Sequence, residues 1–82
     1  MQVTIRYYAG ARSAAGREEE SLEAAEGSTV GDVASQLAAR HGSALARVLD
    51  VSSFLVDEVV AAPDRRVPAG ATLDVLPPFA GG

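Results

Sequence analysis

The chain begins with a strict alternation of apolar and polar residues over positions 2–8. One face carries Val3, Ile5 and Tyr7, and the other carries Gln2, Thr4, Arg6 and Tyr8. A period of two with β-branched and aromatic side chains is typical of a strand with one buried face. Shorter patterns of the same kind predict four further strands, over residues 20–24, 53–56, 59–61 and 72–76.

Thr29 begins the most clearly patterned helix. Its hydroxyl is suited to cap the first turn, and Asp32 follows near the positive end of the helix. Residues then recur on one face with helical spacing: Val30, Val33, Ala34, Leu37, Ala38 and His41. Gly42 is a typical helix end. Residues 43–49 predict a second, short helix, and residues 9–16 predict a loop with at most one helical turn.

These elements predict an α+β fold with one mixed sheet of about five strands and one main helix packed on one face. With 82 residues the chain has room for one core. We expect a domain over residues 1–76 and a flexible tail over residues 77–82. The tail starts at Pro77-Pro78, because proline has no N–H to donate to a sheet.

Composition excludes several classes of site. The chain has no cysteine and one histidine, which argues against disulfides and metal centres. Eleven acidic residues against seven arginines give a net charge of −4, which disfavours nucleic acid and suits a basic partner protein. Neither a secretory signal nor an apolar stretch long enough to span a membrane is visible, so we expect a cytoplasmic protein.

A few apolar residues fall on the face that the alternation leaves away from the main helix. Tyr8, Val60 and Leu76 predict an apolar patch there, near the root of the tail, where a partner protein would dock. Phe79 suits either a partner's groove or the domain's own core. Arg12 suits an acidic partner or solvent.

The remaining charged residues give bland predictions. Glu18, Glu19 and Glu20 are expected along a solvated strand edge, and Asp57-Glu58 in a tight turn. His41 falls in the last turn of the main helix, where a cation is favoured, and we expect no catalytic role for it.

The chain ends in Gly81-Gly82. Glycine has no Cβ, so its backbone can pass through a channel too narrow for other residues. A terminal carboxylate is a poor electrophile until it is activated, for example by joining to AMP, after which a sulfur nucleophile can displace AMP. Gly82 is therefore the predicted reactive residue, with Gly81 beside it. The chain itself supplies neither a nucleotide site nor a base.

Two segments carry a resemblance to a known family. The start, Ile5-Arg6-Tyr7-Tyr8-Ala9-Gly10-Ala11-Arg12, and the end, Pro77-Pro78-Phe79-Ala80-Gly81-Gly82, are similar to the MoaD/ThiS family of sulfur carriers. These are ubiquitin-like β-grasp proteins. Within the family, the Pro-Pro-x-Ala-Gly-Gly ending most resembles that of the small subunits of molybdopterin synthase.

The resemblance implies partners and a reaction. A ubiquitin-activating-like enzyme would adenylate Gly82 with ATP, and a sulfur donor enzyme would convert it to a thiocarboxylate. The tail, with Phe79 and Ala80, would then enter the large synthase subunit, in a heterotetramer, and give its sulfur to a pyranopterin precursor. The chain would be a non-catalytic subunit that binds no cofactor or metal itself.

Other functions remain open at this point. Carriers for thiamine, cysteine, tRNA thiolation or tungsten cofactor also end in Gly-Gly. A ubiquitin-like protein modifier would use Gly82 in an amide bond to a lysine of another protein, and a plain interaction module would not use it at all. The chain contains no lysine, so it cannot be joined through a side-chain amide to its own kind.

Overall fold

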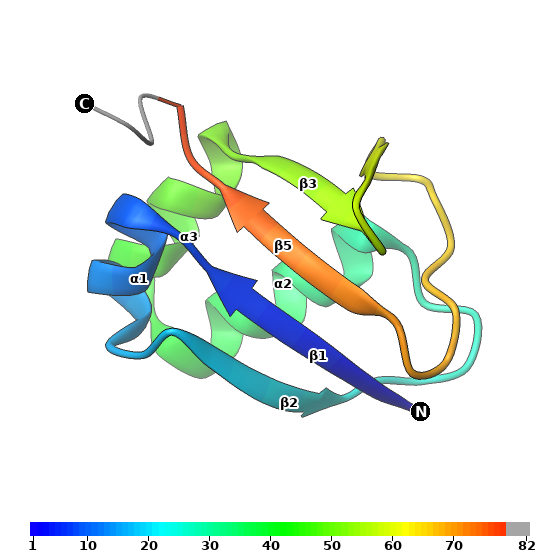
Figure 1. Ribbon diagram of the computed structural model, residues 1–82. Coiled ribbons are helices and arrows are strands. Elements are labelled where there is room, and N and C mark those ends of the chain that lie inside the picture. The colour runs from blue at the N-terminus through cyan, green and yellow to red at the C-terminus, as the bar shows by residue number, and fades with distance from the viewer. Residues whose placement is uncertain (79–82) are drawn as a thin grey trace.

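The computed structural model describes residues 1–78, and the predictions for Phe79, Ala80, Gly81 and Gly82 lie outside this range. Five strands and three helices follow one another along the chain (Figure 1). In chain order they are β1 (Gln2–Tyr7), α1 (Ala9–Ala15), β2 (Glu19–Glu23), α2 (Val30–His41), α3 (Ser43–Val51), β3 (Ser53–Val56), β4 (Val59–Ala61) and β5 (Thr72–Leu76).

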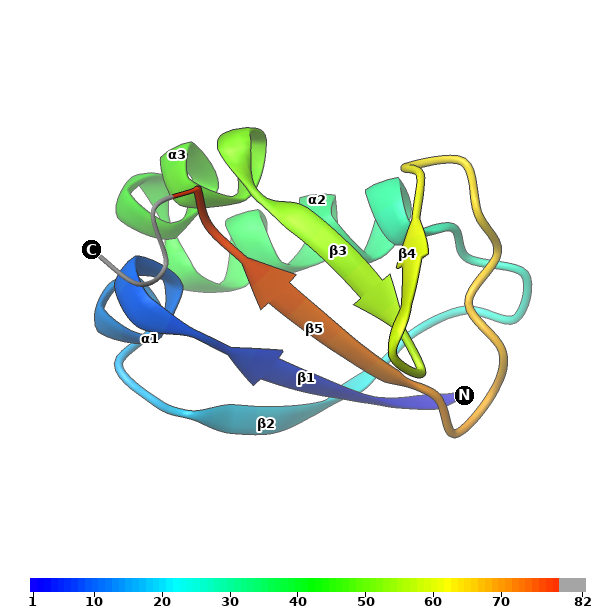
Figure 2. The same cartoon turned by 45° about the horizontal axis from the view of Figure 1, so that its top comes forward.

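The strands form one mixed sheet in the order β2-β1-β5-β3-β4. The central strands β1 and β5 are parallel, and every other pair is antiparallel. All five strands match the predicted ones to within one residue at each end. The first and last strands of the chain thus lie side by side, with β3 on the other side of β5 (Figure 2).

All three helices cover one face of the sheet, so the other face is open (Figures 1 and 2). The core lies between the sheet and the helices. Its largest fully buried side chains are Tyr7, Ile5, Leu22, Leu37, Leu45, Leu73, Val3, Val30, Val33, Val56 and Val75. The α+β, β-grasp prediction is therefore confirmed.

The caps of α2 agree with the sequence. Thr29 accepts a hydrogen bond from the Asp32 backbone N–H at 3.1 Å, and the Asp32 carboxylate accepts one from the Thr29 backbone N–H at 2.9 Å. This reciprocal capping box satisfies two N–H groups that a helix start would otherwise leave unpaired. The hydrogen bonds hold the pKa of Asp32 below its usual value.

The expectation of a loop over residues 9–16 was wrong, because α1 occupies Ala9–Ala15. Ala11 and Ala15 lie four residues apart and are both buried, while Gly16 ends the helix with a left-handed φ of 75°. This helix is too short to be stable alone, so tertiary packing and not local pattern decides it. The second, short helix predicted over residues 43–49 is confirmed as α3, so only α1 was not predicted.

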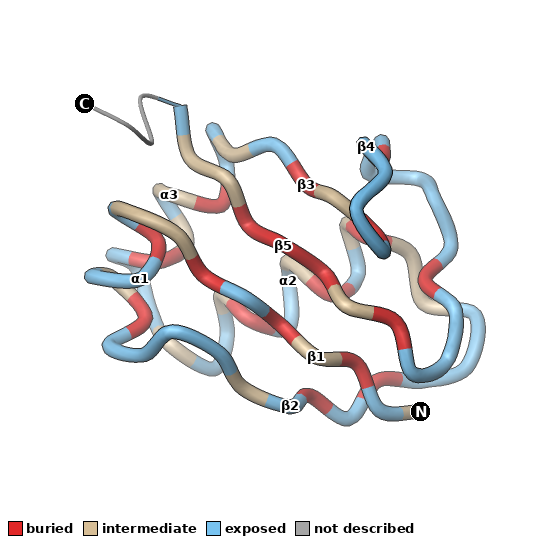
Figure 3. The backbone as a smooth tube through the Cα atoms, viewed as in Figure 1, coloured by how far each residue is buried: buried red, intermediate tan, exposed pale blue. Residues whose placement is uncertain are grey.

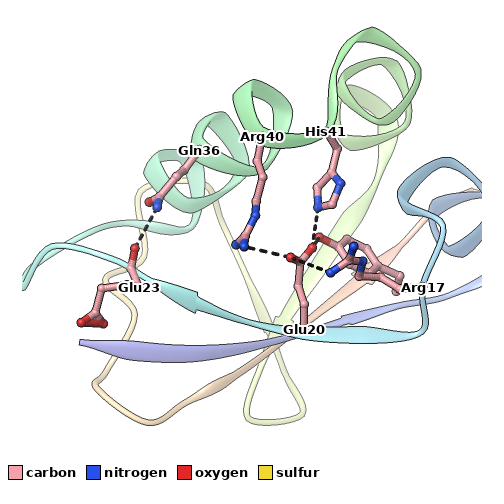
Figure 4. A network of polar contacts seen from close by, with 7 residues as sticks. Arg17, Glu20, Glu23, Gln36, Arg40 and His41 are labelled. Carbon is pink, nitrogen blue, oxygen red and sulfur yellow. Dashed lines mark hydrogen bonds and ion pairs between the residues drawn. The ribbon is translucent and has the colours of Figure 1, made fainter.

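The prediction that Glu20 is solvated was also wrong. Its side chain is 4 % exposed and lies between β2 and the end of α2 (Figure 4). Glu20 shares alternate positions with Leu22 and Ala24, which are buried, so the signal for its inward direction was present in the sequence.

Two hydrogen-bonding groups and two arginines surround the Glu20 carboxylate, whose Oε1 makes ion pairs but no hydrogen bond within the described chain (Figure 4). Oε2 accepts a hydrogen bond from the Tyr7 hydroxyl at 2.5 Å and lies 2.5 Å from His41 Nε2. Guanidinium nitrogens of Arg40 and Arg17 lie 3.4 and 3.7 Å from Oε1. The network ties the end of α2 to β1 and β2.

The network also shifts ionisation. Burial alone would raise the pKa of Glu20, but the hydrogen bonds from Tyr7 and His41 and the charge of Arg40 outweigh it and lower that pKa. Burial and the hydrogen bond to Glu20 raise the pKa of the Tyr7 hydroxyl. His41 therefore belongs to a polar network that joins the end of α2 to the sheet.

Candidate functional site

The chain leaves the sheet at the end of its central strand. Because β1 and β5 are parallel, both strands finish at the same end of the sheet, where Tyr7 pairs with Val75. Tyr8 keeps an extended backbone, so it follows as the neighbour of Leu76. Pro77 is half-buried and Pro78 is exposed. The described part of the chain therefore ends at Pro78, just beyond the end of β5 (Figure 1).

Tyr8 and Leu76 lie on the open face, as predicted, and both are half-buried. Leu55 also lies on this face, directly opposite Val60 on β4, and it is a diagonal neighbour of Leu76 across β3 and β5. The sequence interpretation missed Leu55. The signal was available, since Phe54 and Val56 face the core and the residue between them must face away.

Val60 is the most exposed large apolar residue described, at 77 %. It belongs to the edge strand β4, two strands away from β5, which places it about 10 Å from β5 across the sheet. Val59, which alternates with Val60 along the strand and therefore points the other way, is exposed too, at 60 %. Tyr8, Leu76 and Leu55 therefore follow a diagonal across the open face, whereas Val60, on the edge strand, also lines a hollow with Ala38 of α2 and Leu49 of α3.

Asp74 interrupts this apolar diagonal. It lies on the open face between Arg6 of β1 and Leu55 of β3, which are its register partners. Burial on β5 therefore runs through three consecutive residues and does not alternate (Figure 3). Asp74 is 7 % exposed, and its Oδ1 has no hydrogen-bond partner among the residues described. Burial, assisted by the charge of Glu58, raises its pKa although Arg6 opposes the shift.

Arg12 projects from α1, close in sequence to Tyr8. Its side chain is half-exposed, and Nη1 lies 3.6 Å from Glu18 Oε1. An exposed pair of this kind contributes little to stability, so Arg12 is available to a partner at small cost.

The described part of the chain offers few chemical groups. Over residues 1–78 no cluster of His, Cys, Asp or Glu side chains has the arrangement of a metal site. None of the helices described is long and apolar enough to cross a membrane.

Comparison with known proteins covers nearly the whole chain. The sequence model of the ThiS family matches residues 5–82. A molybdopterin synthase sulfur carrier subunit from Chlamydomonas reinhardtii is 29% identical over 84 residues, covering 100% of both chains.

Two solved structures add the fold. Small archaeal modifier protein 1 (SAMP1) from Haloferax volcanii is similar with a TM-score of 0.86 and 27% identity over 100% of both chains. A chain of the BexX/CysO complex from Amycolatopsis orientalis has a TM-score of 0.72 and 28% identity, and the match covers 98% of this chain and 99% of that one. With its five-stranded β-grasp sheet and its Gly-Gly end, this chain belongs to the ThiS family of ubiquitin-like sulfur carriers.

Proposed function

We propose that Gly82 is the group that carries sulfur, and that the carried sulfur serves molybdopterin synthesis. The observation that carries this proposal is the position of Gly81-Gly82, a few residues beyond the end of β5 in a β-grasp domain of the ThiS family.

The chemistry needs two steps that other proteins perform. The Gly82 carboxylate attacks the α-phosphorus of ATP in an activating enzyme, which forms an acyl adenylate and releases pyrophosphate. A hydrosulfide ion supplied by a donor enzyme then attacks the acyl carbon, and AMP leaves with the electron pair of the broken C–O bond. The product is a terminal thiocarboxylate.

Two observations support molybdopterin as the pathway. The Chlamydomonas relative is named as a molybdopterin synthase subunit, and the ending Pro77-Pro78-Phe79-Ala80-Gly81-Gly82 resembles that class. In this proposal the open face docks on the large synthase subunit in a heterotetramer. Phe79 and Ala80 then pass with the two glycines into its active site, and Arg12 lies at the rim of the contact.

Intact-mass measurement tests the carrier role. The protein purified from its own host should contain a fraction in which one oxygen is replaced by sulfur. A chain that ends at Pro78 keeps every described residue and should lack that fraction. A single unmodified mass for the full chain, even with the activating and sulfur-donor enzymes present, would refute sulfur carriage by Gly82.

Protein modification is the second candidate, and the likeness to SAMP1 favours it, since that protein is named a modifier. A modifier would form an amide between Gly82 and a lysine of another protein. Heavier conjugates that survive reducing agents and disappear in the chain ending at Pro78 would support this role. The absence of lysine from this chain predicts that such conjugates contain single copies and no chains of it.

A further inference from the structure

We propose that an acidic hollow on the open face receives a basic side chain, arginine or lysine, from the docking partner. The hollow has a volume of about 200 Å³ and is lined by Arg6, Asp57, Glu58, Thr72 and Asp74. The identity of the partner, the large synthase subunit, rests on the proposed function, but the chemistry of the hollow does not.

One oxygen of the Asp74 carboxylate is unpaired within the described chain. This carboxylate is more than nine-tenths buried, lines the hollow, and has an Oδ1 without a hydrogen-bond partner among residues 1–78. A buried charge without a partner is costly, so a protein retains it where a ligand or partner supplies the missing donor.

The side chains that line the hollow carry more negative than positive charge. Three carboxylates line the hollow, against the single guanidinium of Arg6. Arg6 is also shared with Glu19, whose Oε1 lies 3.8 Å from Arg6 Nε, and within the described chain it forms no ion pair with Asp74. Asp57 Oδ1 accepts the Thr72 backbone N–H at 2.9 Å, whereas Glu58 makes no ion pair or side-chain hydrogen bond there. The unneutralised charge selects a cation.

Two apolar residues near Asp74, Leu55 and Leu76, favour a side chain over a free ion as the ligand of the hollow. These carboxylates do not have the arrangement of a metal site in the described part of the chain. Leu55 is the direct neighbour of Asp74, and Leu76 lies about 7 Å further along β5. The aliphatic stem of arginine or lysine can lie along such residues while its charged end reaches the carboxylates.

The β3–β4 turn allows binding to be separated from folding. Asp57 and Glu58 have φ values of 46° and 70°, and a two-residue hairpin turn of this kind favours glycine at the second position. Replacing Glu58 by glycine should therefore stabilise the fold while it removes a carboxylate from the hollow.

The test measures the dissociation constant of the purified large synthase subunit for matched variants. D74N and E58Q should each weaken binding by about tenfold or more, as expected for removing one partner of a buried charge pair. E58G should weaken binding similarly while raising the melting temperature. E26Q, in the exposed β2–α2 turn, makes the same change in net charge and should alter binding less than about twofold.

Binding of D74N and E58Q that equals that of E26Q would overturn the proposal. A second probe applies whether or not the large subunit is the partner. Nα-acetyl-arginine amide should cause saturable NMR shifts at the amides of residues 57–58 and 72–75, and these should vanish in D74N. Equal shifts with the neutral Nα-acetyl-glutamine amide, or no shifts at all, would also overturn it. Failure of sulfur loading at Gly82 would instead refute the proposed function.

Discussion

The two faces of the sheet each hold a largely buried carboxylate, and the two are treated in opposite ways. On the helix-covered face, Glu20 is surrounded by the Tyr7 hydroxyl, His41 and two arginines. On the open face, Asp74 Oδ1 has neither a hydrogen bond nor an ion pair within the described chain, whereas Glu20 Oε1, which also lacks a hydrogen bond, lies near Arg40 and Arg17. The pKa of Glu20 is lowered in the folded protein and that of Asp74 is raised.

The difference separates a structural group from one that is available for binding. Glu20 stabilises the fold because its donors come from several elements, so losing it would leave those donors unpaired. Asp74 has no such set of donors within residues 1–78, and in our proposal a docked partner covers its position among Leu55, Leu76 and Arg6. The following predictions test this contrast, from the largest expected effect to the smallest.

Replacing Glu20 by alanine should have the largest effect. It leaves Arg17, Arg40 and His41 close together without their anion, and we expect a loss of about 3 kcal/mol in the free energy of unfolding. Urea denaturation measures this. E23A is the matched control, since Glu23 is exposed on the same strand and pairs only with the N-terminus, at 3.3 Å. Equal stability of the two variants would contradict a structural role for Glu20.

Leu76→Arg should weaken binding to the large subunit by about 2 kcal/mol, roughly 30-fold, because it places a charge in the proposed contact. The fold should persist, since the side chain is on the open face. V51R is the control, because Val51 is 63 % exposed on α3, away from that face. Isothermal titration calorimetry gives both constants, and an unchanged value for L76R would remove Leu76 from the contact.

Asp74→Asn should have an effect of opposite sign to E20A. Removing an unpartnered buried charge should raise the free energy of unfolding at neutral pH by about 1 kcal/mol. For a domain of this size that corresponds to a rise of about 4–8 °C in melting temperature. Thermal unfolding followed by circular dichroism measures it. A lower melting temperature would show that Asp74 is satisfied in the free protein.

The pH dependence of stability should show the same contrast with smaller differences. Glu20 has a lowered pKa, so its contribution is present above the ordinary value of 4.5 and is lost as pH falls through the lower folded value. The pKa of Asp74 is raised in the folded protein. At low pH the carboxyl group is protonated in both the folded and the unfolded state, and the free energy of unfolding declines as pH rises from 3.8 through the higher folded value.

Unfolding free energies of E20Q and D74N across this range separate the two contributions. In E20Q, the free energy of unfolding should no longer show the decline at acid pH that protonation of Glu20 causes. The free energies of unfolding of D74N and the unchanged protein should converge at low pH. Parallel curves for all three proteins would contradict both assignments.

Much of the fold followed from local pattern. The alternation located all five strands, and Thr29 and Gly42 marked the ends of α2. The helix α1 could not be predicted in this way, because its residues are mostly small and give only a weak helical pattern of hydrophobic positions. Its stability comes from burying Ala11 and Ala15. The alternation of residues along β3 and β2 also indicated which face of the sheet Leu55 and Glu20 occupy, although no role was predicted for either residue.

The sequence by itself therefore determined the strands, the main helix and the Gly81-Gly82 end with its single carboxylate. Only the tertiary structure decided which side chains meet. Alternation assigns a residue to a face, but its neighbours on that face depend on strand order and register, which are set by pairing between distant segments. The parallel pairing of β1 with β5 brings Arg6 beside Asp74, and the pairing of β3 brings Leu55 to the other side. The fold thereby surrounds one carboxylate with hydrogen-bonding groups and cations and leaves Oδ1 of the other without a partner within the described chain.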